Sequence, residues 1–135
     1  MKATDSCYPF RLGKLKCAVI SDGTITVPDR HIEPMHTSAD EHPEIELYVL
    51  TLLIDTGENV VLIDTGLGDA DPKQVKAGKL HDNLEAAGIS RSSIDTVIHT
   101  HGHEDHVGGN IDETGKPAFP NARLNQHWPI SQMTS

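Results

Sequence analysis

A chain of 135 residues is long enough for one domain at most. Its hydrophobic share of 36% and aromatic share of 4% are low for a domain that builds its whole core alone. The formal charge is −9, from 20 acidic and 11 basic residues, and no Lys/Arg cluster stands out. These features argue against electrostatic binding to nucleic acid or to an anionic membrane.

The chain shows no targeting or membrane segment. No apolar run approaches the roughly 18 residues of a membrane span, and the first residues, MKATDSCYPFRLG, lack the apolar stretch of a signal peptide. A cytoplasmic location is therefore the default expectation. Cys7 and Cys17 are too few for a disulfide framework, so we expect two reduced thiols. The alternative is a bridge between neighbouring strands.

The N-terminal segment, residues 1–27, predicts consecutive short strands, with turns at Gly13 and at the pair Asp22-Gly23. Residues 28–46 lose all periodicity and carry three prolines. This composition predicts a long acidic loop, and long loops in small domains often act as lids or binding loops.

Two apolar runs follow, residues 47–54 and 60–63, separated by the turn residues 57–59. They predict a hairpin. Because the apolar residues are continuous rather than alternating, both faces of the hairpin are expected to be covered.

A helix and a strand complete the regular structure. Leu80, Leu84 and Ala87 fall on one helical face, and Gly88 stands where a glycine ends a helix. Residues 94–100, IDTVIHT, then predict a short strand. Strands, hairpin, helix and strand in this order indicate an α+β fold, a mostly antiparallel sheet with helix cover.

The chemistry of the chain is concentrated directly after that strand, in His101, His103, Asp105 and His106. Neutral imidazoles and a carboxylate are the ligands that zinc prefers, and Mn²⁺, Fe²⁺ or Co²⁺ are alternatives. Two metals would share the residues, with His101 and His103 on one and Asp105 and His106 on the other. A hydroxide held between the metals would be a strong nucleophile. The competing readings are a chance cluster of solvated histidines and a nickel- or copper-sequestering loop.

The segment THGHEDHVGG resembles the HxHxDH signature of the metallo-β-lactamase superfamily. VVLIDTGLG resembles the strand and turn before the first helix of these enzymes, and residues 84–123 are similar to their lactonase and methyl-parathion-hydrolase-like branch. The resemblance runs from about Phe10 to Arg123 and implies an αββα sandwich. It also implies zinc ligation by His101, His103, Asp105 and His106.

The same resemblance implies roles for two carboxylates and a reaction. Asp64 would lie beside the metals without binding them, and Asp105 could pass a proton to the leaving group. The reaction would be attack of a metal-bound hydroxide on a lactone or ester. The alternatives are a non-catalytic metal-binding remnant and the RNA-processing phosphodiesterase branch, which usually has glycine where this chain has Glu104.

The family's domain is roughly twice this length, so the resemblance covers its N-terminal half, and residues 1–135 are expected to form one incomplete domain. The family's remaining ligands lie in the second half. Residues 47–123 hold the hairpin, helix, strand and metal-binding loop, whereas residues 124–135 are an atypical tail without the expected strand. The exposed sheet would be covered by a second copy of the chain, by a partner supplying the missing half, or by nothing in a poorly soluble product.

The other histidines are not expected to bind metal. We expect His99 to point away from the metals and to bond to backbone. The rest are predicted to be solvated, on the surface of the tail, in the acidic loop or on the polar side of the helix: His127, His31, His36, His42 and His81.

Overall fold

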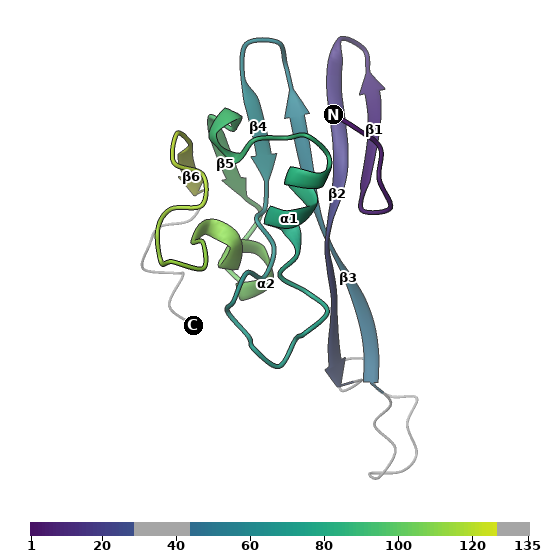
Figure 1. Ribbon diagram of the computed structural model, residues 1–135, viewed down its shortest axis with the longest axis vertical. Coiled ribbons are helices and arrows are strands. Elements are labelled where there is room, and N and C mark those ends of the chain that lie inside the picture. Colours follow the sequence, from purple (N-terminus) through teal and green to yellow (C-terminus); the bar gives the residue numbers. More distant parts are fainter. Residues whose placement is uncertain (29–43, 127–135) are drawn as a thin grey trace.

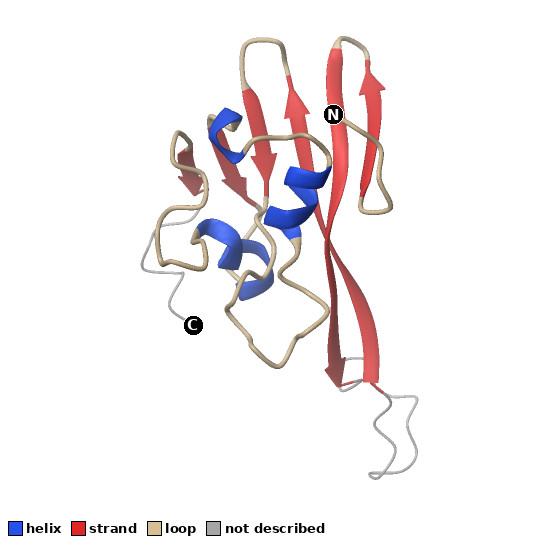
Figure 2. Ribbon diagram, in the orientation of Figure 1, coloured by secondary structure: helices blue, strands red, loops and turns tan. Residues whose placement is uncertain are grey.

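The computed structural model describes residues 1–28 and 44–126, which form one six-stranded sheet with short helices on one face (Figures 1 and 2). The strands lie side by side in chain order, from β1 to β6. The elements are β1 (Cys7–Leu12), β2 (Leu15–Pro28), β3 (Glu44–Asp55), β4 (Val60–Ile63), α1 (Leu80–Ala86), the 3₁₀ turn η2 (Arg91–Ser93), β5 (Thr96–His99), α2 (Glu104–Val107), the 3₁₀ turn η3 (Gly108–Asn110) and β6 (Arg123–Gln126).

The sheet is mixed. Strands β1 to β4 pair antiparallel, whereas β4, β5 and β6 pair parallel. Parallel neighbours need a crossover connection, and α1 provides it between β4 and β5. The carboxyl ends of β4 and β5 therefore meet at one edge of the sheet. The α+β expectation is confirmed, with an antiparallel part and a parallel part in the same sheet.

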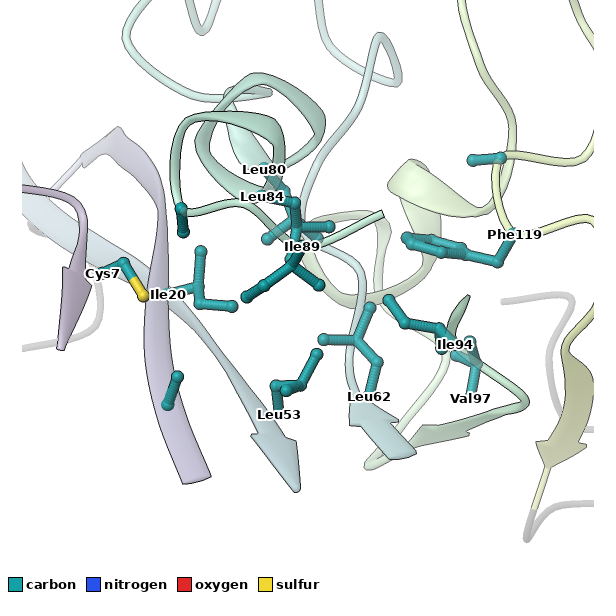
Figure 3. Close-up of a cluster of buried hydrophobic side chains, with 13 residues drawn as sticks. Cys7, Ile20, Leu53, Leu62, Leu80, Leu84, Ile89, Ile94, Val97 and Phe119 are labelled. Carbon is teal, nitrogen blue, oxygen red and sulfur yellow. The ribbon is translucent and has the colours of Figure 1, made fainter. Parts of the chain in front are cut away.

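One face of the sheet carries the core. The register aligns Ala18, Leu53, Leu62 and Val97 across four strands, and all four side chains are buried. Helix α1 covers this row with its predicted apolar face (Figure 3). The fully buried members of the cluster come from the sheet, from α1 and from the segment before β5: Ala18, Ile20, Leu62, Leu84, Ala87, Ile94 and Val97.

The opposite face has no cover in the described chain. The register aligns Val19, Leu52, Ile63 and Ile98 on this face, because side chains alternate along a strand. Ile98 is 37% exposed and Leu50, two residues before Leu52, is 52% exposed. Among the described residues, the predicted cover of the hairpin is therefore present on one face only. The hairpin's continuous apolar runs instead give one buried face and one bare apolar face.

The predicted turn at Asp22-Gly23 is also wrong, because β2 continues through it as a single strand of 14 residues. The register shifts between Ser21 and Gly23, so the extra residue forms a β-bulge. Gly23 adopts a φ of 110°, which an L side chain rarely permits, and a Cβ there would overlap the Lys76 carbonyl. The turn-like dipeptide thus marks a bend within a strand.

Strands β2 and β3 extend into the segment predicted as an acidic loop, and a further strand lies in the segment predicted as a tail. Pro28 and residues 44–46 belong to β2 and β3, and residues 29–43 lie outside the described chain. A strand was not expected after Arg123, yet β6 pairs parallel with β5. This edge strand is held by backbone pairing, which an apolar pattern does not reveal. The solvated histidines predicted in the loop and tail fall outside the described residues: His31, His36, His42 and His127.

The remaining local predictions can be placed directly. Gly88 follows α1 with a φ of 75°, as expected of a helix-ending glycine. Cys7 and Cys17 are both buried free thiols. In the pairing of β1 with β2, Cys7 lies opposite Ile20 and Cys17 opposite Phe10, so the two thiols do not face each other. Within the described chain, no helix combines the length and apolar character needed to cross a membrane.

Candidate metal centre

The carboxyl ends of β4 and β5 bring Asp64 next to the histidine-rich loop. The Asp64 amide donates to the Ile98 carbonyl at 2.8 Å, which extends the parallel pairing by one residue. Asp64 then leaves the strand with a φ of 64°, the only non-glycine residue of the described chain in the left-handed region. Such a conformation costs energy and persists where surrounding contacts enforce it, most often at functional sites.

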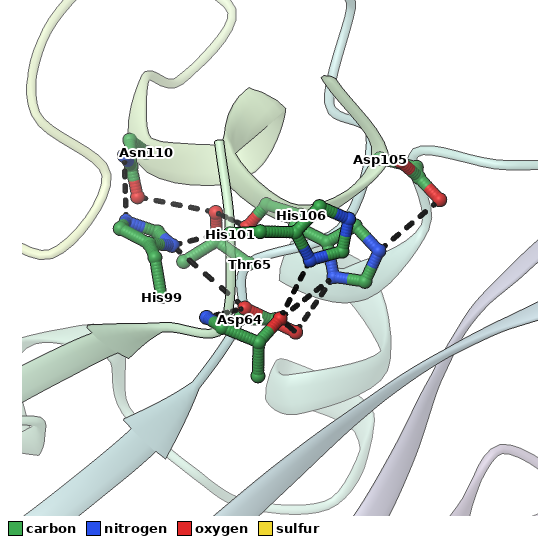
Figure 4. A network of polar contacts seen from close by, with 8 residues as sticks. Asp64, Thr65, His99, His101, Asp105, His106 and Asn110 are labelled. Carbon is green, nitrogen blue, oxygen red and sulfur yellow. Dashed lines mark hydrogen bonds and ion pairs between the residues drawn. The ribbon is translucent and has the colours of Figure 1, made fainter. Parts of the chain in front are cut away.

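Three hydrogen bonds hold the Asp64 carboxylate (Figure 4). The Thr100 amide donates to Oδ1 at 2.8 Å, and both the Thr100 hydroxyl and His106 Nδ1 donate to Oδ2 at 2.7 Å. Burial raises the pKa of Asp64, but the bonds from Thr100 and His106 outweigh it, and the pKa lies below its usual value. Asp64 is therefore a buried anion at neutral pH.

That anion determines which ring nitrogens carry protons. An ionised carboxylate only accepts, so His106 Nδ1 is protonated, and Nε2 keeps its lone pair if the ring is neutral. The Thr100 hydroxyl donates its proton to Asp64, so it accepts from His101 Nδ1 at 3.1 Å. Both imidazoles are thus held with Nδ1 occupied and Nε2 available as a ligand, the arrangement by which a carboxylate orients metal-binding histidines.

All four predicted ligands lie together around α2. The ring centre of His101 is 4.6 Å from that of His103 and 3.8 Å from that of His106. His106 Nε2 lies 3.4 Å from Asp105 Oδ2. A lone pair and a carboxylate oxygen at this distance repel each other unless a proton or a cation lies near both. The donor set therefore suits a cation such as zinc.

The side chains are not preassembled around one ion. Among residues 1–28 and 44–126, no group of three His, Cys, Asp or Glu side chains is arranged to hold a metal as it stands. The rings of His101 and His106 contact each other, with 3.8 Å between their centres. All four residues lie within six positions between β5 and the end of α2, so convergence on one ion requires changes of side-chain rotamer.

A buried polar network lies beneath the loop. His99 Nδ1 donates to the His106 carbonyl at 3.1 Å, and His99 Nε2 accepts from the Asn110 amide at 3.0 Å. Asn110 Oδ1 in turn accepts from the Thr65 hydroxyl at 3.1 Å. Burial lowers the pKa of His99, so this ring is neutral near pH 7. The prediction that His99 bonds to backbone rather than to metal is consistent with this geometry.

The two glycines after α2 allow the metal loop to lie directly on the loop after β4. A Cβ on Gly108 would overlap the Leu67 carbonyl, and one on Gly109 would overlap the Thr65 carbonyl. Close approach is the requirement here, because Gly108 has an ordinary helical φ of −60°. The Thr65 amide donates to the His106 carbonyl at 2.9 Å, which joins the two loops across this contact.

Sequence reasoning placed His81 wrongly on a solvated helix face. Its Nε2 lies 2.8 Å from the Gly109 carbonyl, and its ring meets the edge of Phe119 at 5.8 Å between ring centres. His81 therefore ties α1 to the metal loop. The helical pattern could not show this, because both partners lie far along the chain.

Sequence reasoning also missed Asp22, which it assigned to a turn. The side chain is 1% exposed and accepts three backbone amides, from Leu67, Gly78 and Leu80, each at 2.9 Å. Burial raises the pKa of Asp22 more than these bonds lower it. An acidic residue in a segment otherwise rich in strand-forming residues was the only signal available in the sequence.

A groove of about 720 Å³ lies on another part of the surface, lined by residues that include His81, Arg91 and Asp112. None of the four candidate ligands lines it. Within the described residues, this groove and the candidate ligands therefore lie apart. The candidate ligands are the stronger guide to function, because hydrogen bonds hold two of their rings in defined orientations.

The fold is thus an α+β arrangement in which a mixed sheet brings imidazoles and carboxylates together at the carboxyl ends of two parallel strands. The sequence model of the metallo-beta-lactamase superfamily matches residues 45–131. The chain belongs to this superfamily.

Solved structures share the fold. A dizinc quorum-quenching lactonase, AidC, in complex with a homoserine product is 30% identical with a TM-score of 0.74, over 88% of this chain and 44% of that chain. The hydrolase AbOPH of the beta lactamase superfamily is 26% identical with a TM-score of 0.75, over 91% and 45% of the two chains. Among curated proteins, an atrochrysone carboxyl ACP thioesterase from Passalora fulva is 44% identical over 62 residues, 46% of this chain and 16% of that protein. The chain spans less than half the length of each of these proteins.

Proposed function

We propose that this chain carries four metal ligands, His101, His103, Asp105 and His106, of a two-zinc hydrolase centre that cleaves a lactone or ester. The observation that carries the proposal is the arrangement around Asp64. One buried carboxylate engages His106 Nδ1 directly and His101 Nδ1 through the Thr100 hydroxyl. Both Nε2 atoms are thereby left available for a cation.

The residues have separate roles in this proposal. His101 and His103 hold one zinc, and Asp105 and His106 hold the other, while Asp64 fixes ring orientation without touching metal. When bound, zinc lowers the pKa of a coordinated water toward 7 and polarises the oxygen under attack. Asp105 is 30% exposed at its side chain, so solvent reaches it, and in this proposal it carries a proton to the departing oxygen.

Similarity supports the substrate class. The names of two matching proteins describe a lactonase and a thioesterase, and both terms denote hydrolysis of an ester or thioester bond. RNA-processing phosphodiesterase chemistry is the weaker candidate, because a chain of net charge −9 repels a polyanion. Mn²⁺, Fe²⁺ or Co²⁺ could occupy the same ligands, since imidazole and carboxylate bind each of them.

The uncovered face of the sheet supports a second proposal, that this chain alone does not form the whole catalytic domain. The aligned apolar side chains of Val19, Leu52, Ile63 and Ile98 would belong inside a two-layer sandwich, and exposed contiguous apolar patches usually mark interaction surfaces. We infer that a second copy of this chain, or a polypeptide carrying the other layer, covers the face and adds the remaining ligands. Alone, the chain is expected to be a feeble catalyst at best.

Hydrolysis assays with matched variants test the function. The zinc-loaded chain is offered a panel of homoserine lactones, aryl esters and phosphodiesters, with and without a chelator. We expect weak, chelator-sensitive cleavage of lactones or esters that Asp105→Asn abolishes and Glu104→Gln retains. Glu104 is the matched control because it neighbours Asp105 on α2 and is exposed. Equal losses in the two variants, or cleavage that survives chelation, would refute the assignment.

Size-exclusion chromatography with light scattering measures the molar mass of the same samples and so tests whether the chain assembles with a second copy. We expect a dimer or larger assembly that Leu50→Lys disperses, because Leu50 lies on the bare face and is 52% exposed. A stable 14.7 kDa monomer with rapid chelator-sensitive turnover would show that the chain alone holds everything the reaction needs.

A further inference from the structure

Asp22 lies under the loops that build the candidate metal centre, although it is on a distant strand. Its Oδ2 accepts the amides of Leu67 and Gly78, and its Oδ1 accepts the amide of Leu80, the first residue of α1. Its backbone carbonyl accepts the Lys79 amide at 2.9 Å. Helix α1 has no capping bond from its own N-cap side chain, so Asp22 supplies the cap from β2.

A first route leads from Asp22 to the metal loop through the segment after β4. Asp22 fixes the Leu67 amide, and the neighbouring Gly66 has no room for a Cβ beside the carboxylate. The Gly66 carbonyl accepts the Gly109 amide at 3.3 Å, and the Thr65 amide donates to the His106 carbonyl at 2.9 Å. The backbone of the candidate ligand His106 thus rests on a segment that Asp22 holds.

A second route leads through α1. Asp22 fixes the amide of Leu80, and the next residue, His81, reaches the Gly109 carbonyl at 2.8 Å. Gly109 is therefore held at its amide by the first route and at its carbonyl by the second. Asp22 is the common origin of both, and it touches no candidate ligand itself.

We propose that Asp22 is a positioning residue for the metal centre, which it sets through these two routes; the inference rests on the proposed function. A purely structural aspartate would stabilise the fold as a whole. A positioning aspartate, when altered, loosens the metal loop more than the rest of the sheet. Asparagine is the informative replacement, because it keeps the size of the side chain but turns one acceptor into a donor that opposes an amide.

The matched control is Ile20→Val, a buried change two residues away on the same strand. It weakens the core without touching either route. His81→Ala is a third variant that cuts the second route and leaves Asp22 in place, so the proposal stays testable if Asp22→Asn does not fold.

Two readouts are taken for each variant. The first is amide hydrogen exchange of the metal-free chain at Thr65 and Gly109, relative to Leu53 in the middle of the sheet. We expect Asp22→Asn to speed exchange at the two loop amides about tenfold more than at Leu53. His81→Ala is expected to speed exchange at Gly109. Ile20→Val should change all three alike.

The second readout is Co²⁺ affinity by competition with a chelating indicator, together with the absorption spectrum of the bound ion. We expect Asp22→Asn to weaken binding about tenfold or more, and Ile20→Val to leave it unchanged. Uniform exchange and unchanged affinity in Asp22→Asn and His81→Ala would overturn the positioning role. Absence of Co²⁺ and Zn²⁺ binding by the unaltered chain would instead overturn the proposed function. The exchange rates of the metal-free chain would still show whether Asp22 holds the loops through the two routes.

Discussion

Two buried aspartates serve the same pair of loops and differ in what surrounds them. Asp22 is 1% exposed and its carboxylate accepts only backbone amides, whereas Asp64 is 6% exposed and accepts from an amide, a hydroxyl and an imidazole. Burial dominates for Asp22 and raises its pKa. For Asp64 the hydrogen bonds outweigh burial and lower its pKa. Asp64 contacts an imidazole and therefore affects its protonation, whereas Asp22 contacts backbone amides and therefore affects the positions of the loops.

The largest expected effect is on stability, from Asp22→Ala. Three buried amides would lose their acceptor, and an unsatisfied buried donor costs about 1–3 kcal/mol. We expect the free energy of unfolding, measured by urea denaturation, to fall by at least about 3 kcal/mol. Asp64→Ala should cost less, since only one of the three donors to Asp64 is a backbone amide, and the Thr100 hydroxyl and His106 ring can bond to water instead. Equal losses would remove the distinction between the two carboxylates.

Metal affinity should depend more on Asp64 than on Asp22, because Asp64 bonds directly to the candidate ligand His106. Asp64→Asn replaces the acceptor of His106 Nδ1 and frees both rings to turn. Loss of such a partner typically weakens metal binding about 10–100-fold. Calorimetric titration with zinc measures this, and Asp55→Asn, on an exposed hairpin end, is the control. Binding as tight in Asp64→Asn as in the unaltered chain contradicts the role given to Asp64.

The two aspartates should also give opposite dependences of stability on pH. The pKa of Asp64 is lowered on folding, so its contribution is present above the pKa of the unfolded chain and is lost as pH falls through the folded pKa. The pKa of Asp22 is raised, so the folded chain binds a proton that the unfolded chain has released, and stability declines as pH rises through that window.

Urea denaturation of the metal-free chain between about pH 3 and pH 7 separates the two contributions. Relative to the unaltered chain, Asp64→Asn should remove a gain in stability with rising pH, and Asp22→Asn should remove a decline. The same sign of change in both variants would count against the environments described for the two carboxylates.

The smallest expected effect comes from Thr100→Val. This change removes the hydroxyl that links Asp64 to His101 and keeps the amide bond to Asp64. One hydrogen bond to a charged group contributes about 1.5–3 kcal/mol, of which part is recovered by water at this exposed residue. We expect titration to show a loss of a few-fold in zinc affinity, because His101 loses the hydroxyl that orients its ring. A loss as large as that of Asp64→Asn would mean that the hydroxyl, not the carboxylate, sets ring orientation.

The proximity of the four candidate ligands could be predicted because they are neighbours in the sequence. His101 to His106 occupy one turn after a strand, so residue type and spacing already bring them together. The helix face of Leu80 and Leu84 was equally local, since helical periodicity places both against the sheet.

The supports of the site could not be predicted in the same way. Asp22 acts on the amides of Leu67, Gly78 and Leu80, which lie more than 40 positions away along the chain and carry no side-chain signal. His81 bonds to a carbonyl, and β6 is held by backbone pairing. Backbone partners are the same at every position, so a sequence does not show which of them a polar side chain will meet.

The measurement that tests the central claim most directly is the zinc content of the chain at equilibrium, by dialysis and elemental analysis. It is compared with a variant that carries alanine at His101, His103, Asp105 and His106, and with Glu104→Gln. We predict about one to two zinc ions on the unaltered chain and on Glu104→Gln, and none on the four-alanine variant. Zinc retained by the four-alanine variant, or none on the unaltered chain, would contradict the account.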